Sequence, residues 1–430
     1  MFYATRNNMK TDNSWFVDAR YGLFIHYGLY SLLERGEWVM NRERLPPQRM
    51  RELASQFTAE KFDAERICDL AVAGGMRYVN LTTMHHDGFC LYDTELTDFN
   101  SVNACGRDLV AELVDAARAR NLRLSLYHSL NNWSGKPDAV AALESKTAYD
   151  EFIGNTFARV REFVTRFNPI DVMWYDGWWP FNAKDWRAEE MNDMVRQIQP
   201  HILFNCRNGL DGDFATPEGH MSPPQPWRPW EGCMTLNDHW GYHRGDDNWK
   251  TPGAVIDLLA KAAQGQGNLI LNIGPRGDGS VPEQSIAVVE AVGNWLRDHG
   301  ECIYDTEPFT YALMERGEHM SDWSYNGMFT RKGRAFYQLV RYWPGRELVV
   351  AGLNTEVERV TLLGHDTECA YTQTNGVVTV TGLPDTAPDP NCPVLRFDCT
   401  AAPEMYLTGG MRVPNVPHPP YDPCESDIQH

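Results

Sequence analysis

The sequence predicts an α/β protein, a (β/α)8-type barrel followed by a small all-β sandwich. Three observations favour this fold. Strand-like and helical runs alternate through the first 300 residues, and after about residue 305 the helical patterns give way to short β-rich runs. Such alternation is typical of a parallel sheet with helical crossovers. A chain of 430 residues is also too long for one ordinary core.

Six strands can be predicted in the first part. Each is a short apolar run, and they are expected at residues 24–27, 77–84, 122–128, 172–176, 201–206 and 268–273. Helical periodicity occupies residues 60–73, 108–120, 146–167, 188–199, 252–264 and 283–299. The Pro- and Trp-rich region 207–245 is expected to be irregular and to contain one or two poorly marked strands of the barrel. An open doubly wound sheet competes, but no Gly-rich phosphate loop follows the first strand.

The second part contains runs typical of a β-sandwich. They lie at residues 335–340, 347–351, 358–363 and 376–380, separated by Gly, Asn, Asp and Pro. We therefore expect a barrel domain over residues 1–305 and a sandwich over 306–413. Residues 414–430 are expected to form a Pro-rich, irregular tail.

Composition excludes several classes of partner. The chain has 39 Lys and Arg against 58 Asp and Glu, and its net charge of −19 disfavours nucleic acid and anionic membranes. The sequence contains no run of 18 apolar residues, so no membrane span is predicted. The first ten residues lack the apolar stretch of a signal peptide, so a cytoplasmic location is the default expectation unless a leader was removed. The spacing of the ten cysteines does not match that of a zinc site. The sequence leaves open whether the protein forms a homo-oligomer.

One strand carries the most informative chemistry. Residues 171–177 read Asp-Val-Met-Trp-Tyr-Asp-Gly, a short apolar run that ends in the carboxylate of Asp176. Alternate side chains share one face of a strand, so Val172, Trp174 and Asp176 are expected to point the same way. A carboxylate beside a Trp suits a reaction on a sugar. The alternative reading of Asp176 is an ordinary helix cap.

Other polar side chains follow the remaining strands. In a parallel barrel the working groups lie at the C-terminal ends of the strands. The residues at the predicted ends are His26, His85, His86, Asp87, Tyr127, His128, Trp133, Asn205 and Arg207, with Glu218 and Glu231 beyond them. Carboxylates, neutral donors and aromatic rings together are typical of a glycosidase site. His26 is also compatible with a core position, and adjacent His85 and His86 would face opposite ways within a strand.

An ordered set of motifs resembles the α-L-fucosidases of glycoside hydrolase family 29. The matching segments include Ala19-Arg-Tyr-Gly-Leu-Phe-Ile-His26-Tyr-Gly-Leu-Tyr30, Gly36-Glu-Trp38, His85-His-Asp-Gly-Phe-Cys-Leu-Tyr92, Gly106-Arg-Asp-Leu-Val, Trp174-Tyr-Asp-Gly177, Trp230-Glu231, Trp240-Gly-Tyr242 and Gly267-Asn-Leu-Ile-Leu-Asn-Ile-Gly-Pro275. Each motif alone is weak evidence for the family. The whole set, however, follows the family's order from residue 19 to 304.

The resemblance implies a retaining exo-glycosidase that releases L-fucose from α-L-fucosides, without metal or cofactor. Asp176 matches the family's nucleophile. The acid/base varies in position across the family, and we favour Glu218, with Glu231 as the alternative. The residues assigned to substrate binding are His26, Glu37, Trp38, His85, His86, Tyr127, His128, Trp174 and Arg207.

Three positions depart from the family pattern. Tyr27 and Met84 stand where a Trp and a Lys are usual, and Tyr175 replaces a small residue. These departures put the sugar preference in question more than the reaction type.

Two other functions compete with this assignment. A metal-dependent hydrolase could use His26, His85, His86 and Asp176, although no H-x-H or H-E-x-x-H spacing occurs. A catalytically weak carbohydrate-binding homologue would be expected to lack the carboxylates, and Asp176 is present.

Overall fold

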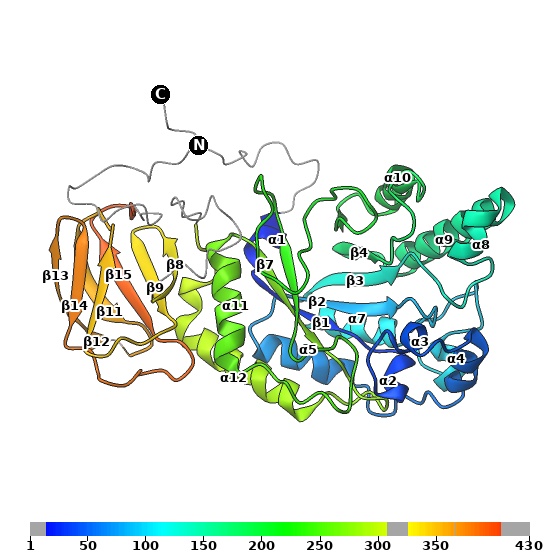
Figure 1. The fold of residues 1–430 in the computed structure, drawn as a ribbon, viewed down its shortest axis with the longest axis horizontal. Helices are drawn as coiled ribbons and strands as arrows, with labels where there is room; N and C mark the ends of the chain where they lie inside the picture. The colour runs from blue at the N-terminus through cyan, green and yellow to red at the C-terminus, as the bar shows by residue number, and fades with distance from the viewer. Residues whose placement is uncertain (1–13, 308–325, 366, 406–430) are drawn as a thin grey trace, which may run out of the picture.

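The computed structural model describes residues 14–307, 326–365 and 367–405. Figure 1 shows two parts, a curled parallel sheet with its helices and a pair of antiparallel sheets at the C-terminal end. This confirms the predicted fold class. The domain boundaries stay predictions, and the Pro-rich tail 414–430 lies outside the described residues.

Seven parallel strands form the first sheet, in the order β5-β4-β3-β2-β1-β7-β6. The strands are β1 (Tyr21–Ile25), β2 (Tyr78–Met84), β3 (Arg123–Ser129), β4 (Val172–Asp176), β5 (Leu203–Phe204), β6 (Glu231–Thr235) and β7 (Asn268–Ile273). The predicted bounds of β4 and β7 are confirmed. β5 is shorter than predicted, and β6 lies within the region expected to be irregular.

A short segment fills the place of an eighth strand. Residues 213–219 make isolated parallel bridges on both sides, Asn205 to Phe214 toward β5, and Ala215 to Trp230 and Glu218 to Cys233 toward β6. The backbone N–H of Glu231 donates to the carbonyl of Ala215 at 2.8 Å. The two edge strands are therefore joined by this segment, which we call the closing segment.

Helices surround the sheet as the periodicity predicts (Figure 1). The longer ones are α5 (Ala64–Ala73), α7 (Leu109–Ala119), α9 (Lys146–Arg166), α10 (Ala188–Ile198), α11 (Pro252–Gln264) and α12 (Glu283–His299). The shorter ones are α1 (Ser14–Ala19), α2 (Tyr30–Leu33), α3 (Val39–Arg42), α4 (Pro47–Ala54), α6 (Ser101–Cys105), α8 (Ala139–Glu144) and the 3-10 turn η2 (Gly300–Cys302). Asp63, Asp108 and Thr251 cap α5, α7 and α11, since each side chain accepts a backbone N–H of the first turn.

Alternation along the strands fills the barrel interior. One residue in two points inward, and the inward side chains form a separate apolar cluster with Phe16 and Ala19 of α1. Its members on the strands and the closing segment are Phe24, Tyr78, Tyr127, Val172, Trp174, Leu203, Phe214, Cys233 and Ile270. The shared face predicted for Val172 and Trp174 is confirmed. These side chains pack the barrel interior.

The C-terminal part is a sandwich of two antiparallel sheets. One sheet has the order β12-β11-β15-β9-β8 and the other β10-β14-β13. Their bounds are β8 (Gly327–Lys332), β9 (Ala335–Val340), β10 (Glu347–Ala351), β11 (Val357–Leu362), β12 (Thr367–Glu368), β13 (Ala370–Thr374), β14 (Val377–Thr381) and β15 (Val394–Cys399). Phe336 and Leu395 of the larger sheet share a core with Val350 and Val378 of the smaller.

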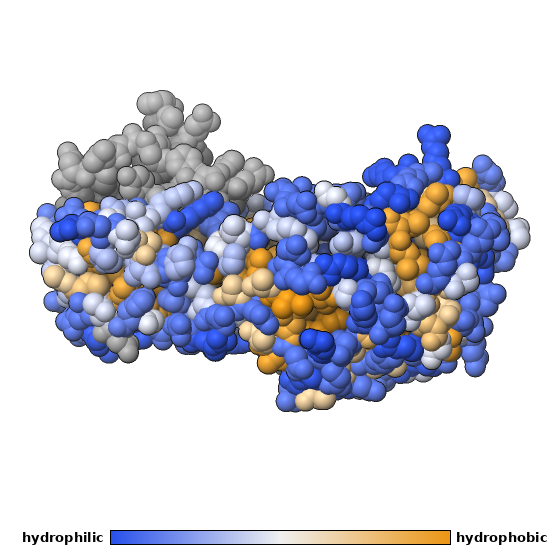
Figure 2. All heavy atoms as spheres, turned by 90° about the horizontal axis from the view of Figure 1, so that it is seen from below, coloured by the Kyte–Doolittle hydropathy of each residue, from blue (hydrophilic) through white to orange (hydrophobic). Residues whose placement is uncertain are grey.

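The sandwich packs against α11 and α12, which lie between it and the parallel sheet in Figure 1. The indole of Trp295 in α12 donates to the carbonyl of Cys392 at 2.8 Å. The surface seen in Figure 2 is mostly hydrophilic over both parts. Within the described residues, every helix is too short or too polar to cross a membrane.

Candidate active site

A small pocket opens at the C-terminal mouth of the barrel. Its volume is about 150 Å³, below the roughly 300–1,000 Å³ of pockets for drug-sized ligands. The lining residues are Phe24, His26, Glu37, Trp38, His85, His86, Tyr127, Trp174, Asp176, Trp179, Arg207, Glu218, Cys233 and Trp240. The structure thus brings together all the predicted site residues except His128 and Glu231. A space of this size suits one small ring rather than a chain of rings.

Asp176 ends β4 and lies in a dense set of hydrogen-bond donors. Its Oδ2 accepts from the hydroxyl of Tyr127 at 2.9 Å and lies 3.7 Å from Nε2 of His86. Its Oδ1 accepts from Nη1 of Arg207 at 3.3 Å. Burial, the largest influence, opposes ionisation, yet Arg207, His86, the N–H of Gly177 and Tyr127 together hold the pKa of Asp176 below its ordinary value. The side chain is a carboxylate at neutral pH, as a nucleophile requires.

Arg207 joins the two carboxylates of the pocket. While Nη1 contacts Asp176, Nη2 donates to Oε2 of Glu218 at 2.6 Å. The guanidinium lies over the Trp174 ring, 4.9 Å from its centroid, and Nε donates to the hydroxyl of Thr216. Glu218 belongs to the closing segment, and 47% of its side chain is exposed. One carboxyl group is therefore buried at the floor, and the other is accessible at the mouth.

Three histidines form one wall of the pocket and are neutral. Burial lowers the pKa of His26 to about 3 and that of His86 to about 4, and it lowers the pKa of His85 well below its ordinary range. Nδ1 of His26 lies 2.6 Å from Oδ1 of Asn272, and Nδ1 of His86 lies 2.7 Å from the hydroxyl of Ser129. Asn272 and Ser129 thus orient the rings of His26 and His86 through their Nδ1 atoms.

His85 and His86 both line the pocket, although neighbours in a strand face opposite ways. β2 ends at Met84, so strand alternation does not extend to these two residues. The ring of His85 stacks on Tyr127, with 5.7 Å between centroids.

Glu231 lies beneath the pocket in the barrel interior and is fully buried. Its carboxylate accepts from the hydroxyl of Tyr78 at 2.6 Å and from the indole N–H of Trp174 at 2.9 Å. Burial raises the pKa of Glu231 to about 7. The group touches the pocket only through Trp174.

His128 lies outside the pocket, although the sequence predicted it among the substrate-binding residues. Its ring stacks on Phe163 of α9 at 5.2 Å, and Nδ1 lies 3.3 Å from the hydroxyl of Thr83. The reason is strand alternation, because Tyr127 points into the barrel and its neighbour must point outward. The residue packs between β3 and the surrounding helices.

Several lining residues were not among the predicted site residues. Phe24 precedes His26 by two positions, so alternation alone would have placed it beside that residue. Trp240 belongs to a motif of the resemblance, and Trp179 stacks on Trp38 with 5.6 Å between centroids. Cys233 had no usable signal, because β6 was not recognised as a strand.

The three departures from the family pattern lie away from this pocket. Tyr27 stacks on Phe62 and donates to the carbonyl of Gly277. Tyr175 packs on Phe204 on the outer side of β4. Met84 lines a neighbouring cavity. The three departures are therefore absent from the residues that line this pocket.

Glu37 is held within the pocket wall, where its Oε2 accepts from the N–H of Gly241 at 2.8 Å. Burial raises the pKa of Glu37. In the part of the chain that the structure describes, no three His, Cys, Asp or Glu side chains are placed to hold a metal ion.

Comparison with known proteins identifies the family. The sequence model of the α-L-fucosidases matches residues 2–301. The chain belongs to the α-L-fucosidase family. It is thus a glycoside hydrolase by family. It is 31% identical to the rat tissue α-L-fucosidase, over 84% of this chain and 83% of the rat protein. The human tissue α-L-fucosidase is 30% identical, over 82% and 80% of the two chains.

Solved structures of α-L-fucosidases share the fold. Isoenzyme 1 from Paenibacillus thiaminolyticus superposes with a TM-score of 0.80 at 31% identity, over 90% of this chain and 98% of that one. An α-L-fucosidase from Bacteroides thetaiotaomicron, with a TM-score of 0.78 and 28% identity over 90% and 95%, was trapped as a covalent intermediate with 2-fluoro-fucosyl fluoride. That relative therefore forms a covalent intermediate.

Proposed function

We propose that this chain releases terminal L-fucose from α-L-fucosides with retention at the anomeric carbon. The observation that carries the proposal is the double contact of Arg207, which holds one carboxylate at the pocket floor and one at its mouth. Two carboxyl groups across one sugar-sized space are the requirement of glycoside hydrolysis. The covalent intermediate of the Bacteroides relative supports the retaining course.

In the first step, Asp176 attacks the anomeric carbon and the bond to the leaving oxygen breaks. A proton from Glu218 goes to that oxygen, so the leaving group departs as a neutral alcohol. The low pKa of Asp176 supports its part, since the carboxylate needs no base to activate it. Glu218 must carry a proton here, so its contact with Arg207 must give way to the leaving oxygen when substrate enters.

In the second step, Glu218 takes a proton from water, and the hydroxide oxygen attacks the anomeric carbon. The ester bond to Asp176 breaks and the carboxylate is restored. Tyr127 and Arg207 donate to the two oxygens of Asp176, which stabilises the carboxylate as it leaves. Glu218 ends the cycle protonated again.

The choice of Glu218 over Glu231 rests on access. The side chain of Glu218 reaches the mouth, where the leaving group must lie. Glu231 has both oxygens occupied by Tyr78 and Trp174 beneath the sugar space. We assign Glu231 a positioning role through the Trp174 ring.

The test is hydrolysis of a panel of aryl α-L-glycosides, with NMR of the first-formed sugar from the substrate that is cleaved. We expect the α-L-fucoside to be preferred and the first product to be α-L-fucose. A first-formed β-anomer would overturn the retaining mechanism. Cleavage of another glycoside without the fucoside would overturn the substrate.

A further inference from the structure

A second cavity lies beside the active-site pocket and has an unusual charge. Its volume is about 290 Å³, and it lies between α4, the loops that follow β2 and β3, and α9. Three cationic side chains line it, Arg51, Lys136 and Arg159, and no Asp or Glu is found among its described lining residues. In a protein of net charge −19, a cavity with only positive charges on its wall is unexpected.

Arg159 is the most unusual of the three. It is only 8% exposed. Nη2 donates to the carbonyl of Leu130 at 3.1 Å and to the hydroxyl of Thr156 at 3.2 Å, whereas the buried Nε has no hydrogen-bond partner. Among the described residues, no carboxylate forms an ion pair with it. A guanidinium is always protonated, so this is a buried cation without a counter-ion, which is costly unless an anion binds.

The neighbouring acidic groups do not supply the missing charge. Burial raises the pKa of the Cys90 thiol to about 12, and burial raises the pKa of Tyr92 well above its ordinary range. Both groups are neutral at physiological pH. Because Cys90 lines the cavity, its wall stays positive.

The cavity also offers neutral donors. The buried hydroxyl of Ser134 has no partner, and Asn132 lines the same wall. Lys136 and Arg51 pair with Asp138 and Asp98 at 3.0 and 2.8 Å, outside the cavity lining. Lys136 is 76% exposed at its side chain and can turn toward a bound group.

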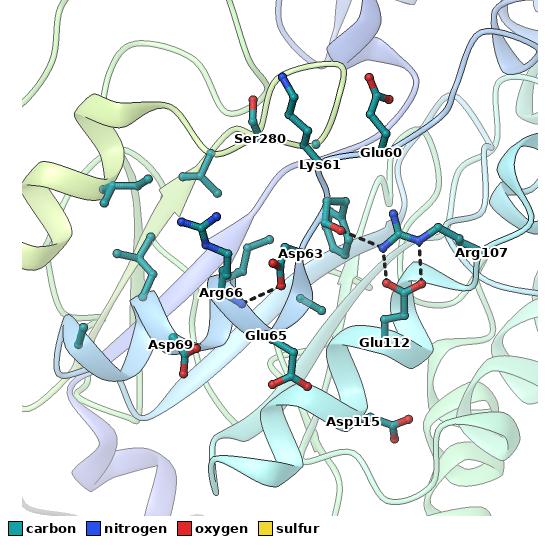
Figure 3. Close-up of a pocket in the computed structure, with 18 of the residues that line it drawn as sticks. Glu60, Lys61, Asp63, Glu65, Arg66, Asp69, Arg107, Glu112, Asp115 and Ser280 are labelled. Atoms are coloured by element: carbon teal, nitrogen blue, oxygen red, sulfur yellow. Dashed lines mark hydrogen bonds and ion pairs between the residues drawn. The ribbon is translucent and has the colours of Figure 1, made fainter.

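A larger hollow elsewhere on the barrel shows the contrast. It lies along α5, beside α7 and α12 (Figure 3). There Arg107 pairs with Glu112 at 2.5 Å, and Lys61 pairs with Asp278 at 2.9 Å. Seven Asp and Glu side chains line that hollow beside its three cations, so it makes no comparable demand for an anion.

We propose that the cavity around Arg159 is a binding site for a small oxyanion, a sulfate or carboxylate group. Arg159 supplies the buried positive charge, and Ser134 and Lys136 supply further donors. Oxyanions suit this set because a guanidinium donates to two oxygens of such a group at once. The proposal that an anion binds does not depend on the reaction in the first pocket.

The loop after β3 lines the second cavity and packs against residues that line the active-site pocket. Asn132 lines the second, and its neighbour Trp133 donates its backbone N–H to the carbonyl of His86 at 2.7 Å. The Trp133 ring packs on those of His86 and Trp38, each with centroids 5.2 Å apart. Two sources of the anion follow, an acidic substituent on the saccharide that carries the fucose, or a free ion. The first source rests on the proposed function.

The site is tested by calorimetric titration of the full chain with inorganic sulfate. We expect saturable binding that Arg159→Met abolishes and that Lys136→Met weakens about tenfold, the loss of one charge-assisted hydrogen bond. Lys61→Met, in the hollow of Figure 3, is the matched control and should bind as the unchanged protein does. If Arg159→Met fails to fold, Ser134→Ala and Lys136→Met carry the test. Absence of saturable binding, or equal binding by all variants, would overturn the site.

A second arm identifies the source. The kcat/KM of a sulfated fucosyl disaccharide is compared with that of its neutral counterpart, in the unchanged protein and in Lys136→Met. A preference for the sulfated substrate that falls in the variant assigns the site to the substrate. Sulfate binding without such a preference assigns it to a free ion. If no fucoside is cleaved, the titration still decides the site, so its failure and that of the proposed function are distinguishable.

Discussion

The indole N–H of Trp174 donates to the buried carboxylate of Glu231 at 2.9 Å. Trp174 also contacts the guanidinium of Arg207 from below. Glu231 thus lies two contacts away from Arg207, which binds the two proposed reacting carboxylates, although Glu231 stands in a sequence motif that made it a candidate acid.

Replacing Glu218 by Ala should affect substrates according to their leaving group. A poor leaving group needs a proton, so kcat/KM on natural fucosides should fall roughly 10²–10⁴-fold, while nitrophenyl fucosides lose far less. The alkaline limb of the pH profile should disappear. Glu231→Ala is the comparison, and we expect it to lower kcat/KM by the same factor for both kinds of substrate. If Glu231→Ala discriminates and Glu218→Ala does not, the two roles are reversed.

Glu231 should make stability depend on pH. Burial raises its pKa from an ordinary 4.5 to about 7. A carboxyl group whose pKa is raised in the folded state stabilises the fold at pH values below its pKa in the unfolded chain. This contribution to the free energy of unfolding is lost as pH rises from about 4.5 to 7. The loss is about 3 kcal/mol.

Glu231→Gln cannot ionise and should lack this dependence. We expect the free energy of unfolding of the unchanged protein, relative to Glu231→Gln, to fall by about 3 kcal/mol between roughly pH 4.5 and 8 in urea titrations. Taking the difference cancels other buried groups, such as Asp87 and the pocket histidines. A constant difference across that range would contradict the raised pKa.

Asp176→Ala should lose at least roughly 10³-fold in kcat on an aryl fucoside. Added azide should restore turnover, because a small anion can occupy the space of the carboxylate, and the product should be a fucosyl azide of inverted configuration. Asp171→Asn, just before the same strand, is the control, since Asp171 contacts Arg123 and Leu124 far from the mouth. Full activity of Asp176→Ala without azide would remove Asp176 from the mechanism.

Gly177→Ala should separate backbone strain from damage to the site. Gly177 has φ of +69°, and an added Cβ would lie 2.8 Å from the hydroxyl of Ser129 and 2.9 Å from Nδ1 of His86. Gly106 has φ of +74° with nothing within 4 Å. Gly106→Ala should lower the free energy of unfolding by about 1–2 kcal/mol, and Gly177→Ala, whose Cβ also meets Ser129 and His86, should lower it by at least as much. Only Gly177→Ala should also lower kcat/KM, by roughly 10²-fold. Equal kinetics in the two variants would contradict the contact with His86.

The barrel and much of its pocket could be predicted from sequence because each relies on a local signal. The apolar run before Asp176 and the periodicity of residues 252–264 and 283–299 have the observed bounds. β6 was missed because it begins with a buried Glu, contains a Gly and follows a Pro-rich stretch. Its place depends on pairing with β7, which is a tertiary contact.

In the site, too, local signals predicted some residues, whereas others depend on tertiary contacts. His26, Trp174 and Asp176 follow from strand ends, and the outward position of His128 was available from alternation with Tyr127. The second cavity was not predictable, since Arg159 belongs to a long helix whose apolar periodicity gives no sign that a guanidinium faces inward. Its neighbours come from α4 and two loops that only the folded chain brings together.

The closing segment has a consequence for how such a protein can diverge. β4 pairs with β3 and β5, so insertion of one residue there would rotate Asp176 out of the mouth. Residues 213–219 lie outside the regular strands, are flanked by loops, and bind the neighbouring backbone over a short stretch only. Lengthening those loops moves Glu218 along the rim and leaves neighbouring strands in register. During evolution, the proposed nucleophile is therefore confined to one position in the sequence. The proposed proton donor can move to another position in the sequence and still reach the same sugar.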